Sequence, residues 1–134
     1  MKYSIKAESY VNNDALLDIK AANIKFGTTS TTSDSLPNPA ELFLGSLAAC
    51  ILKSVERFSG MMKFNYSKAS ISVIANRLEN PPRMDRVNYE LTVYSQDEKL
   101  NVLLLQKNIE KHGTIFNTVQ QSCTISGHVH IQKA

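Results

Sequence analysis

The sequence lacks the features that would place it in a membrane or send it out of the cell. No apolar run approaches the roughly 20 residues that a membrane-spanning helix needs. The opening stretch MKYSIKAESYV alternates polar and apolar side chains and lacks the apolar core of a signal peptide. We therefore expect a cytoplasmic protein that has no membrane partner.

Runs of basic residues are also absent. The net charge is only +3, Lys and Arg are spread along the chain, and no RNA- or DNA-binding motif accompanies them. The sequence therefore predicts no nucleic-acid partner. Its length of 134 residues is too short for two domains with cores of their own, so we expect a single domain over residues 1–134.

Cysteine is scarce, with Cys50 and Cys123 the only two in the chain. Structural disulfides are rare in the cytoplasm, so the two thiols are expected to be free, catalytic or redox-active. The question for function is whether Cys50 only fills space in a helix or is a reactive thiol with Cys123 as its partner.

The first half of the chain predicts short strands, a loop and a helix. Tyr3, Ile5 and Ala7 alternate with polar residues, and residues 15–21 and 23–27 resemble two further strands. Ser, Thr and Pro dominate the following segment up to Pro39, which is typical of a loop. A helix is expected from Pro39 or Ala40 to Gly60, with Asn38 or Pro39 at its cap.

The second half predicts a hairpin, a second helix and a last strand. The stretches ASISVIANR and VNYELTVYS are separated by the turn signal ENPPRMD, and residues 97–113 form an amphipathic pattern with an acidic start and a basic end. In TISGHVHIQ, His128 and His130 are expected to face outward. This order predicts an α+β fold, with antiparallel sheets packed on two main helices.

Cys50 lies at the edge of the apolar stripe of its predicted helix, since each residue advances by about 100°. The stripe comprises Phe43, Leu44, Leu47, Ile51 and Phe58, and the other side carries Ser46, Lys53 and Arg57. A neighbouring cation lowers the pKa of a thiol and so favours the nucleophilic thiolate. The alternative is a cysteine that only packs, as most lone cysteines do.

The run NPAELFLGSLAACI, which ends just after Cys50, resembles the motif of the OsmC/Ohr family of osmotically inducible and organic-hydroperoxide-resistance proteins. The shared pattern is a Pro, an acidic residue with a Leu-Leu-like pair, a stretch of small residues and then the Cys. The resemblance extends over most of the chain, through the order of its elements and the second Cys. It implies an OsmC-like fold and an intertwined homodimer with two sites at the interface.

The resemblance also implies a reaction, the reduction of organic hydroperoxides in oxidative-stress defence. Cys50 would attack the hydroperoxide and become a sulfenic acid, Cys123 would resolve it as a disulfide, and a dithiol would reduce the disulfide. Phe43, Leu47 and Arg57 would contact the substrate. The two thiols carry this chemistry, so no cofactor is expected.

Several assignments stay open on the sequence alone. Glu41 is either an acid at the helix N-terminus or a carboxylate that orients the base of the active site. Ala40 directly follows Pro39 and no Arg precedes Arg57, unlike in the better-studied peroxidases of the family. These departures favour an alternative function, a non-catalytic dimer that binds a small apolar or thiol-reactive ligand between its subunits.

A metal site formed by Cys123, His128 and His130 is the last possibility that the sequence raises. The two histidines share a strand face, but the run lacks a second ligand pair and a tight turn. We therefore expect solvated histidines and no metal.

Overall fold

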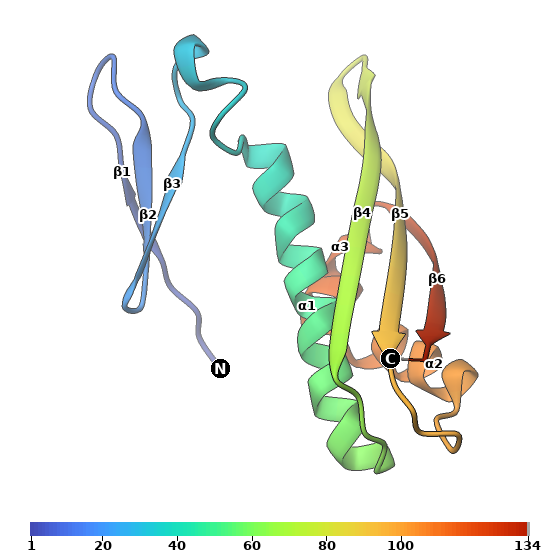
Figure 1. The fold of residues 1–134 in the computed structure, drawn as a ribbon. Helices are drawn as coiled ribbons and strands as arrows, with labels where there is room; N and C mark the ends of the chain where they lie inside the picture. Colours follow the sequence, from blue (N-terminus) through green and yellow to red (C-terminus); the bar gives the residue numbers. More distant parts are fainter. Residues whose placement is uncertain (134) are drawn as a thin grey trace. The chain divides into compact units, whose positions relative to one another are not determined.

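The computed structural model describes residues 1–133, which divide into two compact units. The first unit is Met1–Phe43 and the second begins at Leu44. Helices and strands occur together in the order β1, β2, β3, η1, α1, β4, β5, α2, α3, β6 (Figure 1). The mixed α+β class predicted from the sequence is confirmed.

The first unit is built on a small antiparallel sheet of β1 (Lys6–Glu8), β2 (Ala15–Ile19) and β3 (Ala22–Phe26). Its register places Leu17 beside Ala7 on one side and beside Ile24 on the other, so apolar side chains share one face. Within residues 1–43, however, Ala15 is the only buried residue. The sheet therefore has almost no core of its own.

The Ser- and Thr-rich segment that follows β3 is a loop with one turn of 3₁₀ helix, η1 (Ser30–Thr32). The carboxylate of Asp14 holds it in place. Its Oδ1 accepts hydrogen bonds from the Thr32 hydroxyl at 2.7 Å, the Thr28 amide at 3.2 Å and the Thr29 hydroxyl at 3.2 Å. These bonds, that of Thr32 above all, lower the pKa of Asp14 because they favour the ionised carboxylate.

Helix α1 (Pro39–Met62) begins where the sequence predicted. It ends two residues beyond the predicted end. Its start is a capping box, in which the Glu41 amide donates to Asn38 Oδ1 at 2.8 Å and the Asn38 amide donates to Glu41 Oε1 at 3.0 Å. The predicted end at Gly60 was wrong. The helix continues to Met62 and is followed by Lys63, whose φ of 59° is left-handed. The next amide, that of Phe64, donates back to the Ser59 carbonyl at 3.0 Å.

The second unit contains a three-stranded sheet in the order β4 (Lys68–Glu79), β5 (Pro82–Tyr94), β6 (Thr124–Gln132). The β4–β5 hairpin is antiparallel, as predicted. The β5–β6 pair is parallel, which differs from the antiparallel pairing expected from the sequence. The reason is the connection between these strands. It contains two helices and brings the chain back to the end of the sheet at which β5 begins, so that β6 runs in the same direction as β5.

Those two helices are α2 (Val102–His112) and α3 (Thr114–Val119). The sequence had placed the start of the second helix at residue 97, which was wrong, and had missed α3. Asn101 caps α2 by accepting the Leu104 amide at 3.0 Å. Asp97 instead accepts loop amides, so the first turn of α2 carries no acidic residue.

The core of the second unit lies on one face of its sheet. From Val87 onward every second residue of β5 is buried there, and the outward positions of His128 and His130 on β6 are confirmed. The helices supply the other side of this core with Leu47, Ile51, Val55 and Phe58 from α1, Leu105 and Ile109 from α2, and Phe116 and Val119 from α3.

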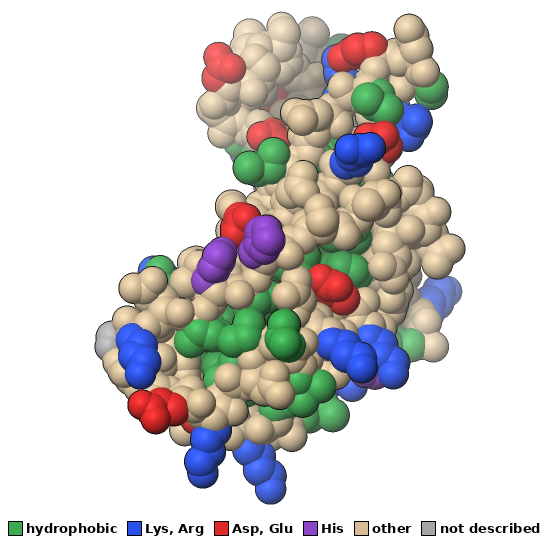
Figure 2. Space-filling view, turned by 90° about the vertical axis from the view of Figure 1, so that its right-hand side faces the viewer, with side chains coloured by type: hydrophobic (Ala, Val, Ile, Leu, Met, Phe, Trp, Pro, Cys, Tyr) green, Lys and Arg blue, Asp and Glu red, His purple; other side chains and the backbone are tan. Residues whose placement is uncertain are grey.

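Some apolar side chains stay outside this core. Hydrophobic side chains reach the surface in the space-filling view (Figure 2), and Leu103 on α2 is 81% exposed. Across the described part of the chain, no helix combines the length and the apolar character needed to cross a membrane.

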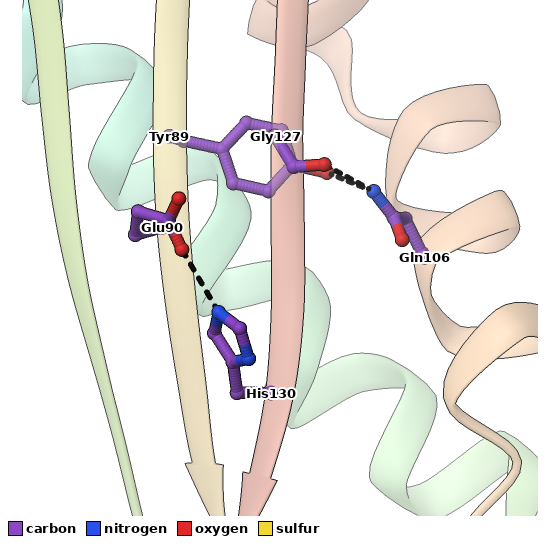
Figure 3. Close-up of polar contacts among 5 residues, drawn as sticks. All are labelled: Tyr89, Glu90, Gln106, Gly127 and His130. Atoms are coloured by element: carbon purple, nitrogen blue, oxygen red, sulfur yellow. Dashed lines mark hydrogen bonds and ion pairs between the residues drawn. The ribbon is translucent and has the colours of Figure 1, made fainter.

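A buried polar contact ties α2 to the sheet (Figure 3). The Tyr89 hydroxyl donates to Glu110 Oε2 at 2.7 Å, while Gln106 Nε2 lies 3.1 Å from that hydroxyl and 3.0 Å from the Gly127 carbonyl oxygen. Burial, together with the bond to Glu110, raises the pKa of Tyr89 far above its usual value. The Tyr89 ring lies directly over Gly127, where a Cβ atom would overlap it.

We expect Gly127→Ala to destabilise the protein by about 2 kcal/mol or more, because the new methyl group must displace a buried ring. Gly60→Ala is the matched control. Nothing lies within 4 Å of the position that its Cβ would take, so the change should stabilise helix α1 by about 0.5 kcal/mol or more. Urea unfolding of both variants measures the difference, and equal stabilities would show that the ring can move away from Gly127.

Candidate functional site

Cys50 is a free, partly buried thiol on α1, where it packs against the core of the second unit. Its sulfur faces the point where α2 gives way to α3. A methyl group built on Gly113 would place its carbon 2.8 Å from Cys50 Sγ, closer than such atoms normally approach. Gly113 is itself buried, so the sulfur lies against the backbone of this junction.

Gly113 is a site residue that the sequence analysis missed. It is both the C-cap of α2 and the N-cap of α3, and its φ of −71° is open to any residue. Glycine is therefore needed at this position because the Cys50 sulfur leaves no room for a side chain, and not because the backbone conformation requires it. A glycine at the end of a predicted helix was the only signal in the sequence, and it gave no indication of Cys50 as the neighbour.

The basic residues near Cys50 on α1 are exposed. The Arg57 guanidinium lies 5.4 Å from the centre of the Phe58 ring, and this ring lies 5.7 Å from that of His112, next to Gly113. Arg57 and Lys53 form no ion pair among residues 1–133. Stacking on Phe58 is therefore the contact that holds Arg57.

Two acidic residues, Glu56 on α1 and Glu110 on α2, bind tyrosines. Glu56 accepts a hydrogen bond from Tyr66, and Glu110 accepts one from Tyr89. The bond to Glu56, with a smaller effect of burial, raises the pKa of Tyr66 to about 12.

Cys123 is also a free thiol but is only 8% exposed. It lies between α3 and β6, where its sulfur donates a hydrogen bond to the Met84 carbonyl oxygen at 3.3 Å and lies 3.9 Å from the Ser122 hydroxyl. Among the described residues, no hydrogen bond joins its sulfur to that of Cys50. Both thiols thus contact the same core, and each has its own neighbours.

The remaining predicted site residues differ in exposure. Glu41 is in the first turn of α1, where its carboxylate completes the capping box. Phe43, which the sequence placed on the apolar stripe of the helix, is 38% exposed, so it is not part of the buried core. Leu47 is fully buried and belongs to that core. Their roles toward a substrate stay predictions.

The two histidines of β6 lie on the exposed face of the sheet. His130 Nε2 is 2.9 Å from Glu90 Oε2 (Figure 3), and the His128 and His130 rings are 6.1 Å apart. Within residues 1–133, no three His, Cys, Asp or Glu side chains are gathered in a way that could hold a metal ion.

Two surface cavities have volumes in the range of small-ligand sites, and neither is lined by Cys50. One, of about 520 Å³, is lined by the β4–β5 hairpin, including Ile74 and Arg86. The other, of about 670 Å³, lies between the loops that leave α1 and β5 and is lined by Lys63 and Lys99. Neither has Cys50 in its lining.

Comparison with known proteins identifies the relatives of this chain. The sequence model of a family described as OsmC-like protein matches residues 32–127, a span that includes both cysteines. No match is found among curated protein sequences.

Solved structures confirm the predicted OsmC-like fold. An OsmC-like protein from Mycoplasma pneumoniae superposes with a TM-score of 0.86 at 18% identity, over 98% of this chain and 97% of its own. An organic hydroperoxide resistance protein OsmC from Legionella pneumophila gives 0.68 at 13% identity, over 96% and 97%. An organic hydroperoxide resistance protein from Elizabethkingia anophelis gives 0.63 at 15% identity, over 100% and 99%.

The capping box separates the two roles that the sequence left open for Glu41. Asn38→Ala should cost about 1 kcal/mol of stability, because it removes the side chain that accepts the Glu41 amide. Glu41→Gln keeps an oxygen that can accept the Asn38 amide, so we expect wild-type stability and an unchanged rate of Cys50 alkylation. Urea unfolding and alkylation at neutral pH test this. Several-fold slower alkylation at unchanged stability would show that the carboxylate acts on the thiol.

Proposed function

This chain belongs to the OsmC-like protein family, and on that premise we propose that it is a thiol-dependent peroxidase that reduces organic hydroperoxides through Cys50. The observation that carries the proposal is the state of this thiol. Cys50 is free and only partly buried, on the helix whose sequence carries the family motif. An unpaired thiol that solvent can reach is the form in which a cysteine reacts.

The chemistry that Cys50 would perform is a two-electron transfer. Its thiolate attacks one oxygen of the peroxide, so that an S–O bond forms while the O–O bond breaks. The alcohol leaves with a proton and Cys50 becomes a sulfenic acid. Cys50 packs against the apolar core, which favours an organic hydroperoxide over hydrogen peroxide as substrate.

The resemblance to the OsmC/Ohr family implies that Cys123 takes the next step, in which it would condense with the sulfenic acid to a disulfide that a dithiol then reduces. This role stays a prediction. It requires the two Cα atoms to come within about 7 Å. It also requires Cys123 to give up its hydrogen bond to the Met84 carbonyl.

We propose a homodimer as the working form. The three strands of the first unit present Ala7, Leu17 and Ile24 on one face, and within residues 1–43 only Ala15 is buried. A chain segment of about 40 residues rarely stabilises itself with so small a core. A second copy of the chain would cover this face.

The dimer is tested by light scattering at micromolar concentration. We expect twice the mass of the chain, because the apolar face of the first sheet needs a cover. Leu17→Lys places a charge on that face and should shift the mass toward the monomer, whereas Leu103→Lys, on the exposed side of α2, is the matched control and should not. A monomer mass for the wild type contradicts the proposal.

The alternative function is a non-catalytic dimer that binds a small apolar or thiol-reactive ligand. One observation favours it: no arginine occurs before Arg57, so the first unit offers no guanidinium to a thiolate. The two functions differ in whether Cys50 is oxidised by the substrate.

The peroxidase proposal predicts that Cys50→Ser abolishes consumption of cumene hydroperoxide, because the attacking sulfur is gone. Ser59→Ala, a hydroxyl deletion on the same helix, is the control and should keep wild-type consumption. Thermal unfolding checks that both variants fold. The wild type should consume cumene hydroperoxide faster than hydrogen peroxide. If excess organic hydroperoxide leaves both wild-type thiols reduced, the peroxidase proposal fails and the ligand-binding alternative replaces it.

A further inference from the structure

A β-bulge interrupts the β4–β5 hairpin near its turn. The register shifts between Ala75 and Arg77, and the described ladder gives Asp85 and Arg86 of β5 no partner on β4. In a regular strand, consecutive side chains point to opposite faces of the sheet. At this bulge both Asp85 and Arg86 line the same surface cavity, which has a volume of about 520 Å³. The bulge therefore brings a carboxylate and a guanidinium to one cavity.

The chain does not neutralise these two charges. Among residues 1–133 the ion pairs are those of Arg77, His130 and Lys133, so Asp85 and Arg86 pair neither with each other nor with another side chain. A guanidinium binds a carboxylate through two parallel hydrogen bonds, and a carboxylate binds an ammonium group. Two neighbouring opposite charges that stay unpaired suit a ligand that carries both charges itself.

The rest of the lining supplies further hydrogen-bonding groups and an apolar surface. Asn88 Oδ1 accepts the Ser126 hydroxyl at 2.5 Å, and its Nδ2 donates to no described residue, so this amide can donate to a carboxylate. Asn76 also lines the cavity, as do Ile74 and Leu78, which are 62% and 39% exposed. A few polar groups beside apolar side chains, in a volume of roughly 300–1,000 Å³, are typical of a small-ligand site.

We propose that this cavity binds a free α-amino acid with a large apolar side chain. The Arg86 guanidinium and the Asn88 amide bind its carboxylate, and Asp85 binds its ammonium group. Ile74 and Leu78 cover its side chain, which has to be large to fill the cavity. Strand β5 is the central strand of its sheet, so the backbone that carries both charges is fixed before the ligand binds.

A ligand with only one charge fits this cavity less well. Asp85 repels an anion that has no ammonium group, and Arg86 repels an amine that has no carboxylate. Each such ligand also leaves one charged side chain of the cavity without a partner. We therefore expect the loss of either charge to weaken binding by about tenfold or more.

The test titrates isotope-labelled full-length protein with L-phenylalanine and follows the backbone amide signals by nuclear magnetic resonance. We expect saturable shifts at Asp85 and Arg86, with a dissociation constant of about 1 mM or below. Hydrocinnamate, which lacks the ammonium group, and phenethylamine, which lacks the carboxylate, should each bind about tenfold or more weakly.

Substitutions assign the two charges. Arg86→Gln and Asp85→Asn should each weaken L-phenylalanine binding by about tenfold or more. Asp85→Asn should also bind hydrocinnamate at least as well as L-phenylalanine, because the repulsion of an anion is gone. Arg83→Gln is the matched control, since it removes a guanidinium from the same strand but outside the lining of the cavity. If a variant does not fold, the three ligands measured on the wild type still decide.

Three results would overturn the proposal. The first is the absence of saturable shifts with L-phenylalanine up to its solubility limit. The second is equal affinity of the wild type for L-phenylalanine and hydrocinnamate, which would show a plain anion site in which Asp85 takes no part. The third is a loss of binding in Arg83→Gln as large as that in Arg86→Gln, which would place the binding site elsewhere.

Discussion

The second unit depends on the close approach of the Tyr89 ring to Gly127. Strand β6 pairs with β5 so that these two residues are neighbours, and the ring can lie over the backbone only because position 127 has no side chain. Its hydroxyl then reaches α2, where Glu110 accepts its hydrogen and Gln106 donates to it. A buried phenol without such partners would cost free energy, so one glycine allows both the packing and the polar contact.

The same contact fixes the position of α2. The Gln106 side-chain nitrogen has two hydrogens but three acceptors within reach, the Tyr89 hydroxyl, Glu110 Oε2 and the Gly127 carbonyl. It therefore joins α2 to both strands. Among the described strands β6 pairs only with β5, so the hydrogen bond from Gln106 gives this edge strand a further partner. The Tyr89 ring also packs edge-on against Phe116 of α3, at 6.3 Å. The junction between α2 and α3 is thus placed by the sheet.

The sequence could predict the features that depend on residues close together in the chain, and not those that depend on residues far apart in it. Alternation identified β5 and β6 correctly, and Asn38 with Pro39 marked the start of α1, because strand faces and helix caps depend on residues close in sequence. The parallel pairing of β6, the short α3 and the extension of α1 to Met62 depend on tertiary packing, which periodicity does not report. For the site, the motif identified Cys50, but the role of Gly113 is set by a sulfur 63 positions away (113 − 50).

The two cysteines show how environment, and not residue type, assigns chemical roles. Cys123 donates its thiol hydrogen to the Met84 carbonyl, a bond that exists only while the sulfur keeps its proton. The thiolate is the nucleophile, so this bond opposes reaction. Among residues 1–133, the Cys50 sulfur makes no such hydrogen bond. It lies against the Gly113 backbone, whose position is secured by the contacts of Tyr89 with Phe116 and α2. The packing around the sheet therefore gives the two sulfurs different surroundings, one with a carbonyl acceptor and one against the backbone of the α2–α3 junction.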